Sequence, residues 1–278
     1  MDRVPGPRDK DAWKLKSPRR KFRSERAEPA SNRGPADEHT HLLYGIHSVR
    51  EALRNPSRRF LRLLATENGA LRLAEDGPLP LQPLIVKPDE IGRRLSADAV
   101  HQGVLLEAEP LDPIDLNDIP ADAVVLALDQ VTDPHNVGAI LRSCAAFGVA
   151  ALLITERHSP EVTGVLAKAA SGALEHVPFA SVRNLSAALE TLKARGFHCL
   201  GLDSDAPESI GRTRMRRPLL LVLGAEGRGL RQKTMATCSE LVRLDMPGKI
   251  KSLNVSNAAA IALYAVRTAL ESRDDTQS

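Results

Sequence analysis

The sequence predicts an α/β protein in which a small α/β unit precedes a mostly parallel sheet with helices on both faces. Three observations predict this class. From residue 123 onward, short apolar strands alternate with helices, an order that is typical of parallel sheets. Residues 123–128 are apolar throughout, as in a strand that is buried on both faces. The chain has 278 residues, of which 42% are hydrophobic, so it can build a core of the required size.

Residues 1–41 are rich in Pro, Ser, Arg and Lys and lack apolar periodicity, which predicts a disordered basic arm. Between residues 10 and 26, eight lysines and arginines stand against two acidic residues. Such an arm can contact RNA phosphates without sequence preference. A tail that only keeps the protein soluble is the alternative.

Residues 42–108 predict a small α/β domain. Its expected helices are 45–55 and 88–95, and its expected strands are 60–65, 84–86 and 104–107. Arg58 is one of several basic residues in this region, most of which are expected to be surface charges. His47 and His101 are each isolated, and an isolated histidine is more often structural than catalytic. Residues 109–121 hold three prolines and four acids, so we expect a linker without helix or strand.

Residues 122–272 predict the larger domain. The expected strands are 123–128, 150–154, 197–202, 219–223 and 240–244, and the expected helices are 137–147, 160–168, 184–195 and a last one after residue 257. Ligands of such sheets bind beyond the carboxyl ends of the strands. Three polar loops are expected there, at 129–136, 224–230 and 245–254.

The last helix follows a polar stretch, Ser252–Asn257, and is apolar around most of its circumference. Ser256 or Asn257 is the expected N-cap. A helix that is apolar on all sides needs a core on one flank and, we expect, a second subunit on the other. The alternative is a capped, buried helix preceded by ordinary turn residues.

Several classes of protein are excluded or disfavoured. The first strand of the larger domain is followed by no G-x-G-x-x-G, and the chain has no G-x-x-x-x-G-K-[ST], which disfavours a Rossmann dinucleotide site and excludes a P-loop. Aromatic residues are 3% of the chain, which disfavours RNA recognition by base stacking on a sheet. The three cysteines form neither a zinc pattern nor a disulfide framework. We expect no metal, no membrane span and no secretory signal, hence a cytoplasmic protein.

Three ordered motifs resemble those of the SpoU family of S-adenosylmethionine-dependent RNA ribose 2′-O-methyltransferases. They are Asp-x-Val-x-Asp-Pro-His-Asn-x-Gly-Ala-Ile-x-Arg-Ser at 129–143, Leu-Gly-x-Glu-x-x-Gly-Leu at 223–230 and Ser-Leu-Asn-Val-Ser-x-Ala at 252–258. Residues 42–108 are similar to the small RNA-binding domain, of the ribosomal-protein L30e fold, in the branch that methylates a guanosine of large-subunit (23S) ribosomal RNA. The segment between residues 65 and 84 is shorter than usual in that branch, and Asn257 replaces a more typical apolar residue.

The resemblance implies a trefoil-knotted SPOUT sheet, a homodimer and S-adenosyl-L-methionine as the cofactor. It also implies the site residues. The catalytic set is Asn136, Arg142, Glu226 and Asn254, and the cofactor-binding set is Leu223, Gly224, Gly229, Leu244, Met246, Leu253 and Ser256. Two other interpretations stay open: Arg142 as a surface charge and Glu226 as a carboxylate that only orders its loop.

The implied reaction is attack of a ribose 2′-hydroxyl on the cofactor's methyl group, helped mainly by alignment of the two reactants. The family's arginine has been cast as the base, but a guanidinium keeps its proton, so we expect Arg142 to grip a neighbouring phosphate. Ribosomal RNA is the expected substrate. The alternatives are the same chemistry on tRNA, and an RNA-binding or ribosome-assembly factor with a silent methyltransferase fold.

Overall fold

The computed structural model describes residues 40–157, 159 and 164–274. The predicted basic arm therefore lies almost entirely outside the described residues, although His41, assigned to it, begins the first strand. The described residues all belong to one unit, in which two sheets follow each other along the chain.

The first sheet is built from residues 41–108 and has four strands in the order β1-β4-β2-β3 within the described residues. Its strands are β1 (His41–Tyr44), β2 (Phe60–Ala65), β3 (Leu84–Ile85) and β4 (Val104–Ala108), and its helices are α1 (Ile46–Arg54), α2 (Glu67–Leu73) and α3 (Pro88–Gly92). β4 pairs antiparallel with both β1 and β2. The local pattern did not predict β1 or α2. The start of α2 is nevertheless marked, because the Thr66 hydroxyl accepts a hydrogen bond from the Gly69 amide as its N-cap.

The second sheet has seven strands in the described residues, in the order β7-β6-β5-β10-β8-β11-β9, and all its pairs are parallel. The strands are β5 (Val124–Asp129), β6 (Ala151–Thr155), β7 (Phe179–Val182), β8 (His198–Leu202), β9 (Glu208–Ser209), β10 (Leu219–Gly224) and β11 (Glu240–Arg243). The predicted parallel sheet is thus confirmed. The short strands β7 and β9 were not predicted; both contain polar residues, and β9 is two residues long.

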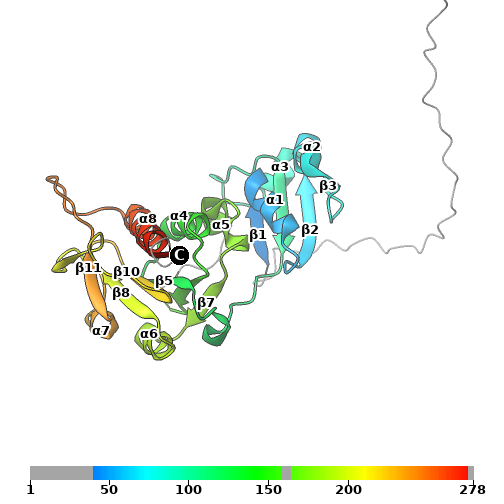
Figure 1. Cartoon of the computed structure of the whole chain (residues 1–278). Helices are drawn as coiled ribbons and strands as arrows, with labels where there is room; N and C mark the ends of the chain where they lie inside the picture. The colour runs from blue at the N-terminus through cyan, green and yellow to red at the C-terminus, as the bar shows by residue number, and fades with distance from the viewer. Residues whose placement is uncertain (1–39, 158, 160–163, 275–278) are drawn as a thin grey trace, which may run out of the picture. The chain divides into compact units, whose positions relative to one another are not determined.

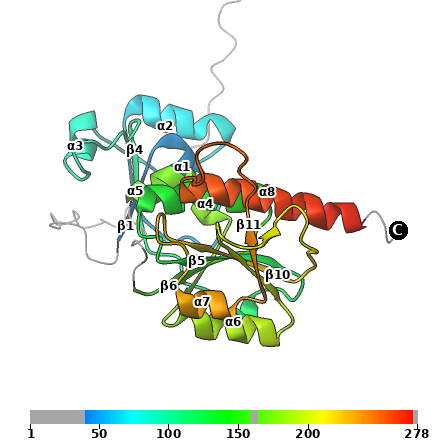
Figure 2. The same cartoon turned by 90° about the vertical axis from the view of Figure 1, so that its left-hand side faces the viewer.

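Helices cover both faces of the second sheet (Figures 1 and 2). One face carries α4 (Pro134–Ala146), α5 (Gly164–Ala170) and α8 (Val255–Asp274), and the other carries α6 (Leu185–Ala194) and α7 (Gln232–Thr237). Alternate residues of β5 serve the two faces: Leu126 packs in the cluster with α4 and α8, and Val125 packs in the cluster with α6. This arrangement explains why residues 123–128 show no polar alternation.

A buried ion pair joins the small domain to the larger one, and its Arg58 is an exception among the basic residues that were mostly expected on the surface. Its guanidinium is fully buried and lies 2.7 Å from the Glu175 carboxylate, and it also donates to the Glu109 carbonyl. Asn55 donates to the same carboxylate. Removing one partner of such a pair typically costs about 3–5 kcal/mol because the other charge stays buried. Substitution of either Arg58 or Glu175 alone should therefore be destabilising.

Two predicted details were wrong. Residues 109–121 hold a 3₁₀ turn at Leu116–Asp118, initiated by Asp115, whose side chain accepts a hydrogen bond from the Asn117 amide. The N-cap of α8 is Asn254, two residues earlier than the first predicted candidate, Ser256. Asn254 caps because its Oδ1 atom accepts both the amide and the hydroxyl of Ser256.

Candidate active site

A cavity of about 340 Å³ lies at the carboxyl edge of the second sheet and is lined by the second and third predicted loops together with the residues that follow β8. The cavity lies beyond β8, β10 and β11 and beside the start of α8. It is lined by Leu202–Asp205, Leu223–Gly229, Leu244, Met246, Lys251–Leu253, Val255 and Ala258. Its volume lies at the lower end of the range for small-molecule sites, roughly 300–1,000 Å³.

The loop after β10 folds back on itself and forms one wall of this cavity. The Gly229 amide donates to the Ala225 carbonyl at 2.8 Å, and the two residues form an isolated bridge. Gly227 and Gly229 both have positive φ, at 76° and 65°, a conformation that side chains disfavour. At Gly224, an added β-carbon would lie 2.1 Å from the Gly229 carbonyl carbon. The glycines of the second motif are therefore needed to let this loop turn.

Asn254 connects the second and third loops to the start of α4. Its Nδ2 atom donates to Asn136 Oδ1 at 3.0 Å and lies 3.5 Å from Glu226 Oε2, the outer limit of a hydrogen bond. Ser256 fixes the orientation of the amide, because its two donors occupy Oδ1 and leave Nδ2 to face Asn136 and Glu226. Three of the four predicted catalytic residues thus come together, although they are far apart in sequence.

The fourth predicted catalytic residue, Arg142, shares no hydrogen bond with this cluster within the described residues. It is exposed on α4, and among the residues that the structure describes it makes no hydrogen bond or ion pair. Asn136 is the third residue of α4, so Arg142 lies nearly two turns further along the helix. The guanidinium is therefore free to meet a ligand from solvent.

Six of the seven predicted cofactor-binding residues line the cavity: Leu223, Gly224, Gly229, Leu244, Met246 and Leu253. Ser256 is not part of the lining and instead holds Asn254. Of the predicted catalytic residues, Glu226 alone is in the lining, and Asn136 and Asn254 lie next to it through their hydrogen bonds.

Sequence reasoning missed two parts of the site. Residues 203–205, which follow β8, line the cavity; their polar character directly after a buried strand was the available signal. Asp129, the first residue of the first motif, is fully buried and binds Arg231, accepting from its amide at 3.0 Å and from its Nε at 2.7 Å. This ion pair ties the end of β5 to the end of the second loop.

The carboxylate of Asp245 marks the start of the third loop. The Ser209 hydroxyl donates to it at 2.6 Å, and this hydrogen bond, together with Arg243, lowers the pKa of Asp245. The carboxylate therefore stays ionised and anchors the loop that carries Met246. In the described residues, no three His, Cys, Asp or Glu side chains are grouped as metal ligands would be.

The residues of the cavity fit S-adenosylmethionine. The cavity is lined by the apolar side chains of Leu244, Met246 and Leu253 and by the backbone of the Gly224–Gly229 loop. Such a lining suits an adenosine group. The acidic side chains of Asp203, Asp205 and Glu226 lie in the same lining and complement the positive charges of an amino group and a sulfonium.

Asn254→Asp tests the Asn254 cluster. Aspartate keeps the N-cap, so we expect the free energy of unfolding to change by less than about 1 kcal/mol. It loses the donor to Asn136 and brings a second carboxylate to Glu226, so methyl transfer should fall about 10²-fold, as for loss of one positioned hydrogen bond. Asn117→Asp, an exposed change of the same charge on the 3₁₀ turn, is the control and should leave the rate unchanged. A rate within threefold of wild type for Asn254→Asp would contradict this role.

Comparisons with known proteins agree on one family. The SpoU rRNA methylase family matches residues 123–264, and the RNA 2′-O ribose methyltransferase substrate-binding domain matches residues 42–114. The chain is 36% identical over 247 residues to the 23S rRNA (guanosine-2′-O-)-methyltransferase RlmB of Vibrio cholerae, covering 84% of this chain and 98% of that protein.

Two further relatives extend this result. RlmB of Ralstonia nicotianae is 36% identical over 237 residues, covering 81% of this chain and 95% of that protein. The SpoU methyltransferase AviRb of Streptomyces viridochromogenes, solved in complex with AdoMet, has the same fold, with a TM-score of 0.71 and 23% identity over 83% of this chain and 90% of that chain.

Proposed function

Since this chain belongs to the SpoU rRNA methylase family, we propose that it methylates the ribose 2′-hydroxyl of a guanosine in 23S ribosomal RNA. That it is an S-adenosylmethionine-dependent RNA 2′-O-methyltransferase follows from the family. The observation that carries the proposal is the meeting of Asn136, Glu226 and Asn254 beside a cavity of suitable lining. The choice of guanosine as the base and of 23S rRNA as the substrate rests on the similarity to the RlmB proteins.

The bound cofactor supplies a methyl group on a positively charged sulfur. The chain's own residues align the ribose hydroxyl with this methyl group. The Asn254 amide, which Ser256 orients, holds Asn136 and Glu226 in one cluster at the N-terminal end of α4. Fixed alignment of two reactants can contribute roughly 7–11 kcal/mol to lowering a barrier. Exposed Arg142 would grip a phosphate next to the reacting ribose through its forked guanidinium.

The hydroxyl proton leaves as the oxygen forms its bond to carbon, and it needs an acceptor. Of the four catalytic candidates, Glu226 alone has a carboxyl group that can take up a proton, because amides are very weak bases and a guanidinium stays protonated. Its Oε2 atom lies 3.5 Å from Asn254 Nδ2, within the same cluster. We therefore assign the proton to Glu226.

The protein acts as a homodimer in this proposal, with α8 in the interface. In one protomer α8 buries Val255, Ala259, Ala262, Leu263, Val266 and Leu270, whereas Ile261 and Tyr264 are 48% and 63% exposed. A single core therefore leaves one apolar side of α8 uncovered. The exposed ring of Tyr264 also packs edge-on against Phe147 at the end of α4.

Ile261→Glu should convert the dimer to a monomer, because a charge buried without a partner in an interface costs several kcal/mol. Light scattering at micromolar concentration measures the mass. Ile85→Glu in the first sheet is the matched control, since Ile85 is also about half exposed, and it should remain dimeric. A monomeric wild type, or a dimeric Ile261→Glu protein, would contradict the interface.

Residues 1–41 are proposed to add RNA affinity without specificity. Removing residues 1–39, which precede β1, should flatten the slope of log affinity against log salt, because fewer counterions are released on binding. Titrations of full-length and shortened protein with the same RNA give the two slopes. Equal slopes would mean that the segment is only a solubilising tail.

None of the helices in the described ranges has the length and apolar character that a bilayer crossing requires. We propose a cytoplasmic location because the proposed substrate is ribosomal RNA.

The class of RNA substrate can be tested by supplying the protein with labelled S-adenosylmethionine and either total rRNA or total tRNA. Label in rRNA supports the proposal. Label in tRNA alone would mean that the enzyme methylates tRNA. No label in either RNA would favour an RNA-binding or ribosome-assembly factor without activity.

A further inference from the structure

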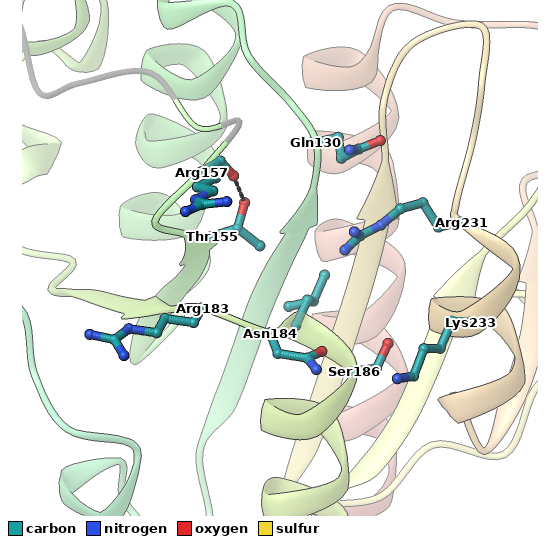
Figure 3. A pocket seen from close by; sticks show the side chains of 9 residues that line it. Gln130, Thr155, Arg157, Arg183, Asn184, Ser186, Arg231 and Lys233 are labelled. Carbon is teal, nitrogen blue, oxygen red and sulfur yellow. Dashed lines mark hydrogen bonds between the residues drawn. The ribbon is translucent and has the colours of Figure 1, made fainter.

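A second cavity, of about 370 Å³, lies at the same carboxyl edge of the sheet but beyond β5, β6 and β7 (Figure 3). Its lining is Gln130, Thr155, Arg157, Arg183–Ser186, Arg231 and Lys233. These residues come from the ends of three strands and from the starts of α6 and α7. The proposed methyl transfer uses none of them.

The side chains around this second cavity are strongly basic. Arg231 and Lys233 approach from the side of α7 and Arg157 from the side of β6, whereas Arg183 turns outward (Figure 3). Arg231 forms an ion pair with Asp129, and Arg183 Nε lies 3.2 Å from Glu156 Oε2, so both of these positive charges are neutralised. Within the described part of the chain, the side chains of Arg157 and Lys233 have no acidic partner. The cavity therefore keeps an excess of positive charge.

The start of α6 adds hydrogen-bond donors to these charges. Asn184 caps the helix by accepting the Ala187 amide, which leaves the amides of Leu185 and Ser186 without a partner inside the helix. The side chains of Ser186 and Lys233 both line the cavity (Figure 3). Two unbalanced cations, a hydroxyl and free helix amides together form a typical site for a phosphate group.

We propose that this second cavity binds a backbone phosphate of the substrate RNA strand, a few nucleotides from the ribose that is methylated. The inference rests on the proposed function, because it assumes an RNA substrate. The two cavities share one loop: its residues 224–229 line the first, and Arg231 lines the second. β6 and β8, near the centres of the two cavities, are three positions apart in the sheet, or about 14 Å at the usual strand spacing. A single RNA strand that crosses the sheet edge can reach both.

The test measures RNA affinity of the full chain at several salt concentrations for wild type, Arg157→Gln, Lys233→Gln and the double variant. Arg231 is left intact, because its loss would strand the buried charge of Asp129. We expect about tenfold weaker binding for the double variant, and the salt slope should decrease by about 0.7 for each phosphate that the protein no longer neutralises. With saturating RNA, kcat should be unchanged while KM rises.

Arg216→Gln is the matched control, because Arg216 is exposed just before β10, at the opposite edge of the sheet. If the double variant binds RNA with the affinity and salt slope of Arg216→Gln, the proposal is overturned. Competition distinguishes the source of the phosphate: a short oligonucleotide should displace the RNA far better than inorganic phosphate does. Equal competition by inorganic phosphate would overturn the assignment to an RNA strand.

The outcome is separate from that of the proposed function. A wild-type protein that methylates no rRNA would reject the proposed function, whereas the loss of affinity in the double variant relative to Arg216→Gln can be measured without any turnover.

Discussion

Gly224→Val abolishes binding of S-adenosylmethionine while the rest of the protein stays folded. An added β-carbon would lie 2.1 Å and 2.2 Å from the carbonyl carbon and oxygen of Gly229 and 2.3 Å from the Leu230 amide nitrogen. All three are backbone atoms, so the loop itself must move. That loop is a wall of the cofactor cavity. The clash therefore lies within the loop itself.

Isothermal calorimetry measures the affinity of this variant, and circular dichroism with a thermal melt checks its fold. Gly92→Val is the control, because an added β-carbon there meets nothing within 4 Å and the backbone has an ordinary φ. It should bind the cofactor like wild type. If a folded Gly224→Val protein binds S-adenosylmethionine with normal affinity, the assignment of the cofactor to this cavity is wrong.

Arg142→Lys is expected to bind cofactor and RNA nearly as wild type does but to methylate about 10²–10³-fold more slowly, the usual effect of losing one positioned hydrogen-bond donor at a transition state. Stability should not change, because Arg142 is exposed and makes no ion pair or hydrogen bond among the described residues. Lysine keeps the charge and its long-range attraction but loses the fork that grips a phosphate at two points.

Single-turnover methyl transfer with saturating cofactor and RNA measures the effect, alongside separate binding titrations. Arg54→Lys on α1, also exposed, makes the same chemical change and should have no effect on the rate. Turnover of Arg142→Lys within about threefold of wild type would reject positioning by the fork. If RNA binding fails while the bound complex reacts normally, Arg142 is a docking residue.

Much of the larger domain could be predicted because its strands have a pattern that only burial on both faces produces. Leu219–Leu223 and 123–128 are apolar without interruption, and they pair as central strands in parallel register. Strands β7 and β9 lie at the two edges of the sheet, where burial is incomplete and polar residues are tolerated. Local sequence carries little signal for such strands.

Interactions between distant residues could not be predicted from local patterns. Arg58 lies among several surface arginines in the sequence, and only the approach of Glu175 from another domain makes it a buried ion pair. The N-cap of α8 was misplaced for a related reason: Ser256 is a good cap by type, but its hydroxyl is used to hold Asn254. The hydrogen bond from Asn254 to Asn136 likewise spans 118 residues.

The site was predicted as a set of residues but not as a geometry. The motifs led to the cavity-lining residues and to the Asn136, Glu226 and Asn254 cluster. They did not indicate that Arg142 is exposed and shares no hydrogen bond with that cluster within the described residues, or that Asp129 and Arg231 tie the first two loops together. The basic cavity beside β6 was missed because all of its lining residues except Gln130 lie outside the three motifs.

The central claim, methylation of a 23S rRNA guanosine, is tested most directly by mapping ribose 2′-O-methyl groups in ribosomal RNA from a strain that lacks this protein. We predict that one guanosine of 23S rRNA loses its methyl group, and that the wild-type gene restores it while the Arg142→Lys gene restores it poorly. An unchanged 23S map, with a methyl group lost from tRNA instead, would contradict the claim.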